Sequence, residues 1–454
     1  MSDPSDRSKP MASFRRRVSG NFGIRIAGLG LQFLGSVLIA RLLGVEALGV
    51  YTFAFTCVVI TGILMSLGME QLSVRELPRF IARGQTGLLR GFLTLQFALI
   101  TLISVIIASV LLWLEGSGRM VFPIAAGWIV AGMVVHALIL NVAAVLAGFQ
   151  RVVQSQLMET LLRQVLFLSV LGLAVYLGFE LGAPEVFGLS VMVGLMVLVC
   201  MVILAWRVLA ELPPDQHQSG QAQNRRQLIP RVWLAASLPL LVMAFANQMQ
   251  TNLDVLMLGV LAEAADVGRY RVASRGADLM LIANGVAVQV LGPMLARALA
   301  HESAEKGRME GQQLITQSAQ LAALLGGGVF AVLTLGAGYY MAIFGADFLS
   351  AAPALRILVA AQMVGILCGP GSVILVTMGR ERLVLLVALT ALAVNVVLNL
   401  TLIPVFGIMG AASATFVAVI FLQGMLMVCV LRTSGFDPTL LALWRRRGAP
   451  RHQG

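Results

Sequence analysis

Charged and amide side chains recur at helical spacing inside the long apolar runs of this 454-residue chain. In the run 268–293, Arg271, Arg275 and Asp278 are four and three residues apart, so a helix places them on one face. An Arg or Asp at the centre of a membrane helix costs about 2.5 to 3.5 kcal/mol and therefore needs an inward-facing role. A guanidinium facing a cavity suits bidentate phosphate binding. The surplus of arginine over aspartate predicts an anionic substrate.

Two further apolar runs carry a polar face of the same kind. Asn247, Gln250 and Asp254 follow one another at helical spacing in 233–260, and Gln32 continues such a face in 21–42. Several polar helix faces predict that these helices surround an aqueous cavity. The candidate substrate-binding residues of this cavity are Arg25, Gln32, Asn247, Gln250, Asp254, Arg271, Arg275, Asp278 and Arg356, and Asn395 and Asn399 are candidates to join them.

Structural roles for the same charges stay open. Arg275 and Asp278 could form an ion pair along one helix, and Arg271 could pair with Asp254 between helices. Arg269 and Arg356 lie near the ends of apolar runs, where long side chains reach the lipid headgroups. For Arg25 the alternative is a topogenic charge near the cytoplasmic end of its span.

The elements that carry these residues are membrane spans. The chain is 59% hydrophobic and only 12% charged, with a mean hydropathy of +0.90, which is far more apolar surface than one globular core can bury. About 20 apolar residues cross a bilayer as a helix. On that template the sequence predicts an all-α protein with about 12 spans, near 21–42, 47–69, 91–114, 121–147, 157–179, 184–206, 233–260, 268–293, 314–337, 354–378, 383–403 and 407–431.

The basic residues orient these spans. The net charge of +11 comes from arginines in short hydrophilic interruptions, so they are interpreted as topogenic charges and not as a nucleic-acid site. Their excess on one side predicts that both termini are cytoplasmic. The Pro- and Gln-rich interval 211–231 is interpreted as a linker. The predicted organisation is a basic tail (1–20), a six-helix lobe (21–210), the cytoplasmic linker (211–231), a second six-helix lobe (232–432) and a second basic tail (433–454).

An internal repeat supports two lobes. The stretch LLGVEALGVYTFA (42–54) resembles MLGVLAEAADVGRYRVA (257–273), and Gly49 and Tyr51 match Gly268 and Tyr270 at a constant offset. The sequence offers no catalytic constellation, phosphate-binding loop or metal-type spacing, because its four histidines are far apart and its four cysteines are scattered in apolar runs. An enzyme is therefore not predicted.

Three stretches carry a family resemblance. The run IARLLGVEALGVYTFAFTCVVITGILMSLGMEQLSVRELPR (39–79) is similar to the opening of polysaccharide biosynthesis membrane proteins, the oligosaccharide-lipid flippases of the multidrug/oligosaccharidyl-lipid/polysaccharide exporter superfamily. NLDVLMLGVL with VGRYRVASR, and LNLTLIPVFGIMGAASAT (398–415), resemble later parts of the same family. The match marks a structural signature, which consists of Arg41, Gly44, Gly49 and Tyr51 in the first half and Asp254, Gly268 and Tyr270 in the second.

The resemblance implies a MATE-like fold in a bacterial cytoplasmic membrane, with two six-helix lobes around a cavity that opens alternately to either side. The implied cargo is an undecaprenyl-diphosphate-linked oligosaccharide, and other polysaccharide-assembly membrane proteins are candidate partners. No cofactor is expected, and a coupling cation, Na⁺ or H⁺, is left open. The alternatives are a cation-coupled multidrug exporter, a lipid II flippase and, in a different class, a membrane ligase or polymerase of polysaccharide assembly, for which a large extracytoplasmic loop is missing.

Overall fold

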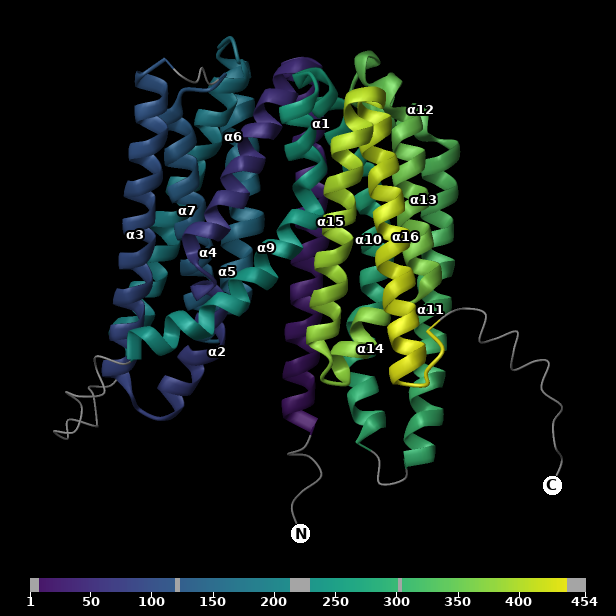
Figure 1. The fold of residues 1–454 in the computed structure, drawn as a ribbon. Coiled ribbons are helices and arrows are strands. Elements are labelled where there is room, and N and C mark those ends of the chain that lie inside the picture. Colours follow the sequence, from purple (N-terminus) through teal and green to yellow (C-terminus); the bar gives the residue numbers. More distant parts are fainter. Residues whose placement is uncertain (1–7, 119–122, 213–228, 301–303, 439–454) are drawn as a thin grey trace. The chain divides into compact units, whose positions relative to one another are not determined.

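The structure is a computed structural model that describes residues 8–118, 123–212, 229–300 and 304–438. Within its helices, the side chains of residues 8–26, 29, 229, 283, 286–290 and 304 lie outside this description. The side chain of Arg25 is therefore not described, nor are residues 213–228 of the predicted linker. Every element among the described residues is a helix or a turn (Figure 1).

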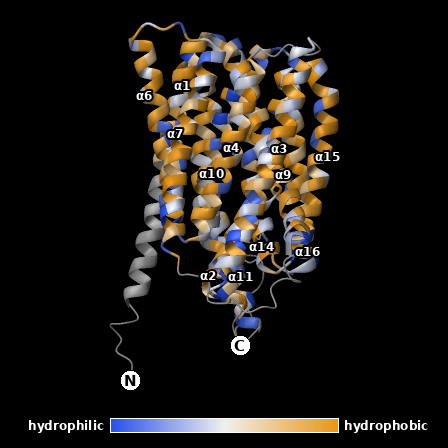
Figure 2. Ribbon diagram, turned by 90° about the vertical axis from the view of Figure 1, so that its left-hand side faces the viewer, coloured by the Kyte–Doolittle hydropathy of each residue, from blue (hydrophilic) through white to orange (hydrophobic). Residues whose placement is uncertain are grey.

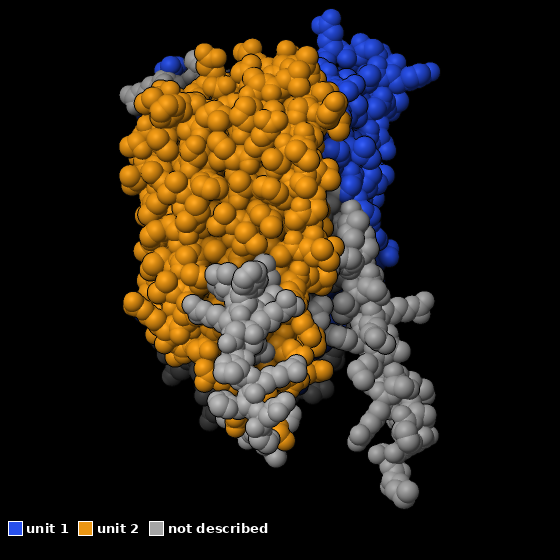
Figure 3. Space-filling model, turned by 90° about the vertical axis from the view of Figure 1, so that its right-hand side faces the viewer, with its two compact units in different colours: residues 1–43, 50–248 blue, residues 44–49, 249–454 orange. Residues whose placement is uncertain are grey.

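The chain divides into two compact units, coloured separately in Figure 3. Unit 1 comprises residues 1–43 and 50–248, and unit 2 comprises residues 44–49 and 249–454. The segment 44–49 belongs to unit 2 although it lies within the first helix. The backbone at Gly44, with φ 74°, interrupts that helix at the first residue of this segment. A left-handed φ is accessible to glycine without a steric penalty.

The helices of unit 1 follow one another along the chain. They are α1 (Ser8–Ser66, apart from 44–49), α2 (Met69–Ala82), α3 (Thr86–Gly116), α4 (Ala126–Gly148), α5 (Val152–Gln156), the π-helix η1 (Leu157–Leu162), α6 (Arg163–Tyr176), α7 (Ala183–Ala210) and the first part of α9 (Ile229–Leu261).

Apart from the segment 44–49, unit 2 begins inside α9 and continues to the end of the described chain. Its helices are the second part of α9, α10 (Ala264–Leu299), α11 (Ala304–Leu335), α12 (Ala337–Phe344), the 3₁₀-helix η2 (Ala346–Ala351), α13 (Ala352–Cys368), α14 (Gly371–Thr377), α15 (Glu381–Phe406) and α16 (Ile408–Thr433). Helices α15 and α16 pack side by side, joined through Gly407 with φ 55° (Figure 1).

Ten stretches of the described chain are long and apolar enough to cross a membrane, and the chain is a multi-pass membrane protein. The helices are hydrophobic along most of their length (Figure 2). Helix α3 illustrates why these helices belong in a membrane. Its side chains Leu102, Val105 and Ile106 are more than half exposed on the protein surface, and in a bilayer they face lipid. The first candidate contains the break at Gly44, and α10 is not among the ten. The count of twelve spans stays a prediction.

One stretch that the sequence pattern presents as a hydrophilic loop is a helix. Helix α2 places Leu72, Leu77 and Phe80 in a buried cluster of unit 1, whereas Arg75 and Arg79 on its other face are exposed. The apolar side chains recur at helical spacing but are too few for a span. Hydropathy therefore presents this stretch as a loop, because a short amphipathic helix needs only one buried face and its average composition is polar.

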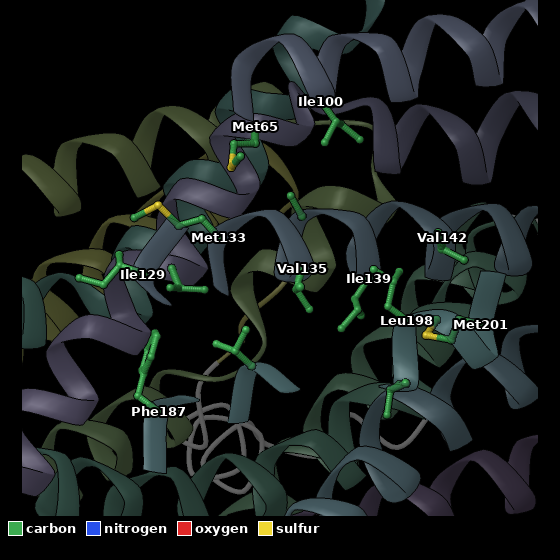
Figure 4. Close-up of a cluster of buried hydrophobic side chains, with 14 of the residues drawn as sticks. Met65, Ile100, Ile129, Met133, Val135, Ile139, Val142, Phe187, Leu198 and Met201 are labelled. Carbon is green, nitrogen blue, oxygen red and sulfur yellow. The ribbon is translucent and has the colours of Figure 1, made fainter. Parts of the chain in front are cut away.

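The core of unit 1 contains an apolar cluster and, next to it, a buried polar network. Figure 4 shows Met133, Phe187 and their neighbours in the apolar cluster. In the network, Asn141 donates to Ser66 Oγ (2.8 Å), Gln96 donates to Asn141 Oδ1 (2.6 Å), and Ser73 donates to Gln96 Oε1 (2.9 Å). These four side chains connect α1, α2, α3 and α4. Between membrane helices such bonds hold neighbours together because lipid offers no alternative partners.

Replacing Asn141 with alanine is expected to destabilise unit 1 by about 1–3 kcal/mol, because Gln96 and Ser66 each lose a buried partner. Thermal unfolding of the purified protein in detergent measures the effect. Thr94→Ala is the matched control, since the exposed Thr94 hydroxyl donates only to the Arg90 carbonyl oxygen of its own helix. Equal unfolding temperatures for the two variants would contradict a stabilising role for the network.

Candidate functional site

A buried carboxylate lies at the centre of unit 2. Asp254 on α9 is only 8% exposed. Its Oδ1 accepts hydrogen bonds from Asn399 (2.8 Å) and Asn395 (3.3 Å). Its Oδ2 accepts from the hydroxyls of Tyr270 (2.7 Å) and Thr415 (2.5 Å). Four helices, α9, α10, α15 and α16, thus contribute side chains to this group, which we name the Asp254 centre.

The local sequence explains how the four helices bring these side chains together. Asn395 and Asn399 are one turn apart on α15, so both amides lie on the same face. On α16, the buried small residues Gly410, Ala411 and Ala414 allow α15 to approach closely, and a Cβ on Gly410 would collide with the carbonyl oxygen of Leu402. Small residues at helix contacts permit this approach in membrane proteins. Thr415 follows directly after this stretch and reaches Asp254.

The Asp254 centre is rich in oxygen atoms and contains one carboxyl group. All four of these donors to Asp254 are neutral side chains. Asn399 Oδ1 is buried without a hydrogen-bond partner. Oxygen ligands of this kind suit a hard cation. The described residues contain no group of three His, Cys, Asp or Glu side chains that could hold a metal ion.

The predicted arginine face of α10 is half-buried. Arg275 Nη1 lies 3.8 Å from Asp278 Oδ2, and the two side chains are 35% and 40% exposed, so this pair is long and contributes little stability. Arg271 is half-buried on the same helix. Arg269 forms an ion pair with Asp266 at 3.1 Å and also donates to the backbone oxygen of Asp347. The headgroup position of Arg269 stays a prediction.

The remaining predicted residues lie in different surroundings. Gln250 donates to the backbone oxygen of Ala388 at 3.2 Å. Arg356 is exposed and donates to the Thr334 carbonyl oxygen at 3.1 Å. In unit 1, Asn247 is exposed and Gln32 is half-buried. Within unit 2 the structure therefore brings Asp254 together with Asn395 and Asn399, and Arg275 together with Asp278, but it does not bring Arg356 into either group.

A second polar centre in unit 1 is absent from the sequence-based candidates. Arg163, at the start of α6, lies over the Phe55 ring with 5.9 Å between the guanidinium carbon and the ring centroid. Tyr51, Glu159 and His136 are close enough to it for electrostatic interaction. The sequence does carry a signal, a glutamate and an arginine four residues apart, but their position near a predicted loop favours a topogenic interpretation.

Solved structures with the same fold are membrane transporters and flippases. An inward-facing multidrug resistance MATE family transporter of the MOP superfamily is 16% identical, with a TM-score of 0.64 over 89% of this chain and 96% of that one. The lipid II flippase MurJ in an inward closed conformation is 14% identical, with a TM-score of 0.62 over 91% and 87%. The MATE multidrug transporter DinF-BH is 17% identical, with a TM-score of 0.57 over 89% and 92%.

These likenesses show a MATE-like fold, as the resemblance of the sequence implied. No curated protein matches the sequence. The model of one family, described as polysaccharide biosynthesis protein, matches residues 15–299, which is more than half of the chain. The chain therefore belongs to the polysaccharide biosynthesis protein family.

Proposed function

We propose that this protein is a flippase that moves an undecaprenyl-diphosphate-linked oligosaccharide across the bacterial cytoplasmic membrane for the synthesis of a cell-surface polysaccharide (O-antigen, capsule or exopolysaccharide). The single observation that carries the proposal is the family match over residues 15–299. The MATE-like fold supports alternating access, in which a membrane protein opens its binding site to one side at a time. Other membrane proteins of polysaccharide assembly are candidate partners.

The arginines are proposed to bind the diphosphate, with Arg271 and Arg275 as the principal residues and Arg25 and Arg356 as further candidates. Bidentate hydrogen bonds from a guanidinium match the geometry of phosphate oxygens. The weak, half-exposed Arg275–Asp278 pair supports this role, because its guanidinium can exchange partners with little loss of stability. Gln32, Asn247 and Gln250 carry amides that suit sugar hydroxyls.

The Asp254 centre is proposed to couple transport to a cation, Na⁺ or H⁺. Its carboxylate is buried and has only neutral hydrogen-bond donors, so a bound cation or proton would neutralise the charge. Asn399 Oδ1 offers a further oxygen ligand without a partner of its own. No sugar or diphosphate is assigned to this centre, because four protein side chains already occupy the hydrogen-bonding positions of Asp254.

A lipid II flippase and a cation-coupled drug exporter are the alternatives, and the structural likeness to both MurJ and DinF-BH makes a direct comparison of cargos informative. Purified protein in proteoliposomes is offered three cargos: a fluorescent undecaprenyl-diphosphate oligosaccharide, fluorescent lipid II and a fluorescent cationic dye of the rhodamine class. Chemical quenching from outside the vesicles measures movement of the two lipids between leaflets. The proposal expects movement of the oligosaccharide lipid. Transport of the cationic dye alone would favour the drug exporter, and movement of lipid II alone would favour the lipid II flippase.

Reversal of the α10 charges is expected to reduce this movement at least tenfold. In Arg271→Glu/Arg275→Glu the diphosphate meets two carboxylates in place of two guanidiniums, and like charges at short range repel. Arg297→Glu, at an exposed position on the same helix, is the control for folding and for charge reversal on this helix. If the double variant is folded and moves the oligosaccharide lipid as fast as Arg297→Glu, these arginines do not bind the cargo.

A further inference from the structure

Arg163 lies on the inward face of its helix in unit 1. It is four residues before Phe167 and eight before Leu171, and both of these side chains are buried. Val165 and Ser169 on the opposite face are exposed. Residues spaced by four share one face of a helix. The charge of Arg163 is therefore directed into the unit, away from the face that Val165 and Ser169 present to lipid.

The guanidinium of Arg163 has no hydrogen-bond acceptor in the part of the protein that the structure describes. Neither a hydrogen bond nor an ion pair to it is present there, although Glu159 lies one turn earlier, within the π-helix η1. The guanidinium carbon lies 5.9 Å from the centroid of the Phe55 ring. A guanidinium presents five N–H donors, and at membrane depth a group of this kind needs a partner. Nearby, His136 Nδ1 is also buried without a partner.

The internal repeat gives the two polar centres opposite charge. Tyr51 and Tyr270 occupy matching positions of the two halves. The hydroxyl of Tyr270 donates to the carboxylate of Asp254, whereas Tyr51 lies close to the guanidinium of Arg163. The position that faces an anion in unit 2 therefore faces a cation in unit 1. A ligand that complements Arg163 must be negatively charged.

We propose that Arg163 binds a phosphate-type oxyanion and that Glu159 competes with this oxyanion for the guanidinium. The inference rests on the proposed function, because it assigns the oxyanion to the diphosphate of the lipid-linked cargo. Two adjacent N–H groups of the guanidinium bind two phosphate oxygens. A glutamate four residues before an arginine is in the favourable order for a helical ion pair, so its carboxylate takes over Arg163 when the oxyanion leaves. Glu159 thereby keeps the affinity low enough for release.

Binding of sodium pyrophosphate to the full-length protein in phosphatidylcholine nanodiscs tests this assignment. Titration calorimetry gives the affinity, with sodium chloride at matched ionic strength as the reference. Arg163→Gln is expected to weaken binding at least tenfold, and Arg163→Lys by an intermediate factor, since lysine is a point charge without the planar fork. Glu159→Gln is expected to tighten binding about three- to tenfold. Arg151→Gln, at an exposed position before α5, is the control.

The variants give distinct outcomes. Wild-type affinity in both Arg163 variants overturns the proposal, and unchanged or weaker affinity in Glu159→Gln overturns the competition. If Arg163→Gln does not fold, the pyrophosphate affinities of Arg163→Lys and Glu159→Gln test the proposal. Nanodiscs that contain phosphatidylglycerol distinguish the source of the phosphate. If this lipid removes the Arg163-dependent pyrophosphate signal, Arg163 holds a lipid headgroup and the cargo assignment is wrong.

Failure of this inference and failure of the proposed function are separable. Movement of the fluorescent oligosaccharide lipid is measured for the same variants in proteoliposomes. Arg163 variants that bind pyrophosphate normally, in a protein whose wild type moves the lipid, disprove the anion site alone. Arg163-dependent pyrophosphate binding in a protein that moves no oligosaccharide lipid disproves the flippase function and leaves an anion site with another source of phosphate.

Discussion

Asp254→Asn is expected to reduce movement of the oligosaccharide lipid at least a hundredfold while the protein remains folded. The amide keeps the size of the side chain. Its oxygen can accept from Asn395 and Asn399, and its nitrogen can donate to the hydroxyl oxygens of Tyr270 and Thr415, which also accept, so most of the hydrogen bonds of the Asp254 centre can persist. The negative charge is lost, and with it the attraction for a cation or proton. If cation binding drives the change in access, the uncharged centre can no longer respond to a gradient.

The measurement is the rate of lipid movement in proteoliposomes with an imposed Na⁺ gradient and, separately, an imposed pH gradient. The wild-type rate is expected to respond to one of them, and the Asp254→Asn rate to neither. Asp347→Asn removes an exposed carboxylate of the same unit and is the matched control. An Asp254→Asn protein that still accelerates with the gradient would rule out coupling at this centre, and the carboxylate would then be a structural acceptor only.

Asp254→Ala separates the structural and coupling roles further. Alanine leaves two amides and two hydroxyls without their common acceptor, and each unsatisfied buried group costs about 1–3 kcal/mol. Asp254→Ala is therefore expected to unfold at a lower temperature than Asp254→Asn, although both lose coupling. Equal stability of the two variants would mean that the surrounding donors find other partners.

Part of the Asp254 centre can be predicted from the sequence. Asp254 can be identified because a carboxylate in an apolar run is costly to insert into a membrane and therefore indicates a functional or paired role. The one-turn spacing of Asn395 and Asn399 identifies a polar face. Thr415 is not visible in this way, because threonines are common in membrane helices and bond to their own backbone, as Thr415 also does to Ala411. Its second partner depends on how α16 packs against α9, which no local pattern encodes.

The fold is predictable to a similar degree. Hydropathy identifies the apolar helices because spans must satisfy their backbone internally. It does not locate the π-helix that carries Glu159, or the break at Gly44 that assigns residues 44–49 to unit 2, since both depend on tertiary contacts. For Arg163, a position near a predicted loop and an inward position give the same sequence pattern. Only the buried neighbours Phe167 and Leu171 distinguish them.

Replacing Gly49 or Gly268 with alanine is expected to have the largest effect on folding. The two glycines occupy matching positions of the internal repeat, and inside unit 2 they face each other. A Cβ on Gly49 would collide with the carbonyl oxygen of Ala264 and lie 3.1 Å from the Gly268 nitrogen. A Cβ on Gly268 would collide with the carbonyl oxygen of Val45. The contact is thus nearly symmetric and is formed by backbone atoms, which cannot move aside as a flexible side chain can.

Each single alanine therefore requires the segment 44–49 to separate from α10, and overpacking of this kind costs about 1–3 kcal/mol, occasionally more. The double variant Gly49→Ala/Gly268→Ala is expected to lose most of its folded protein, measured as the monodisperse fraction in size-exclusion chromatography and by thermal unfolding. Gly327→Ala is the control, because a Cβ there meets nothing within 4 Å. If both single variants match Gly327→Ala in yield and unfolding temperature, the helices tolerate separation at this crossing. The repeated Gly-x-Tyr motif would then serve to position Tyr51 and Tyr270 beside their two oppositely charged centres, and not to pack the backbone.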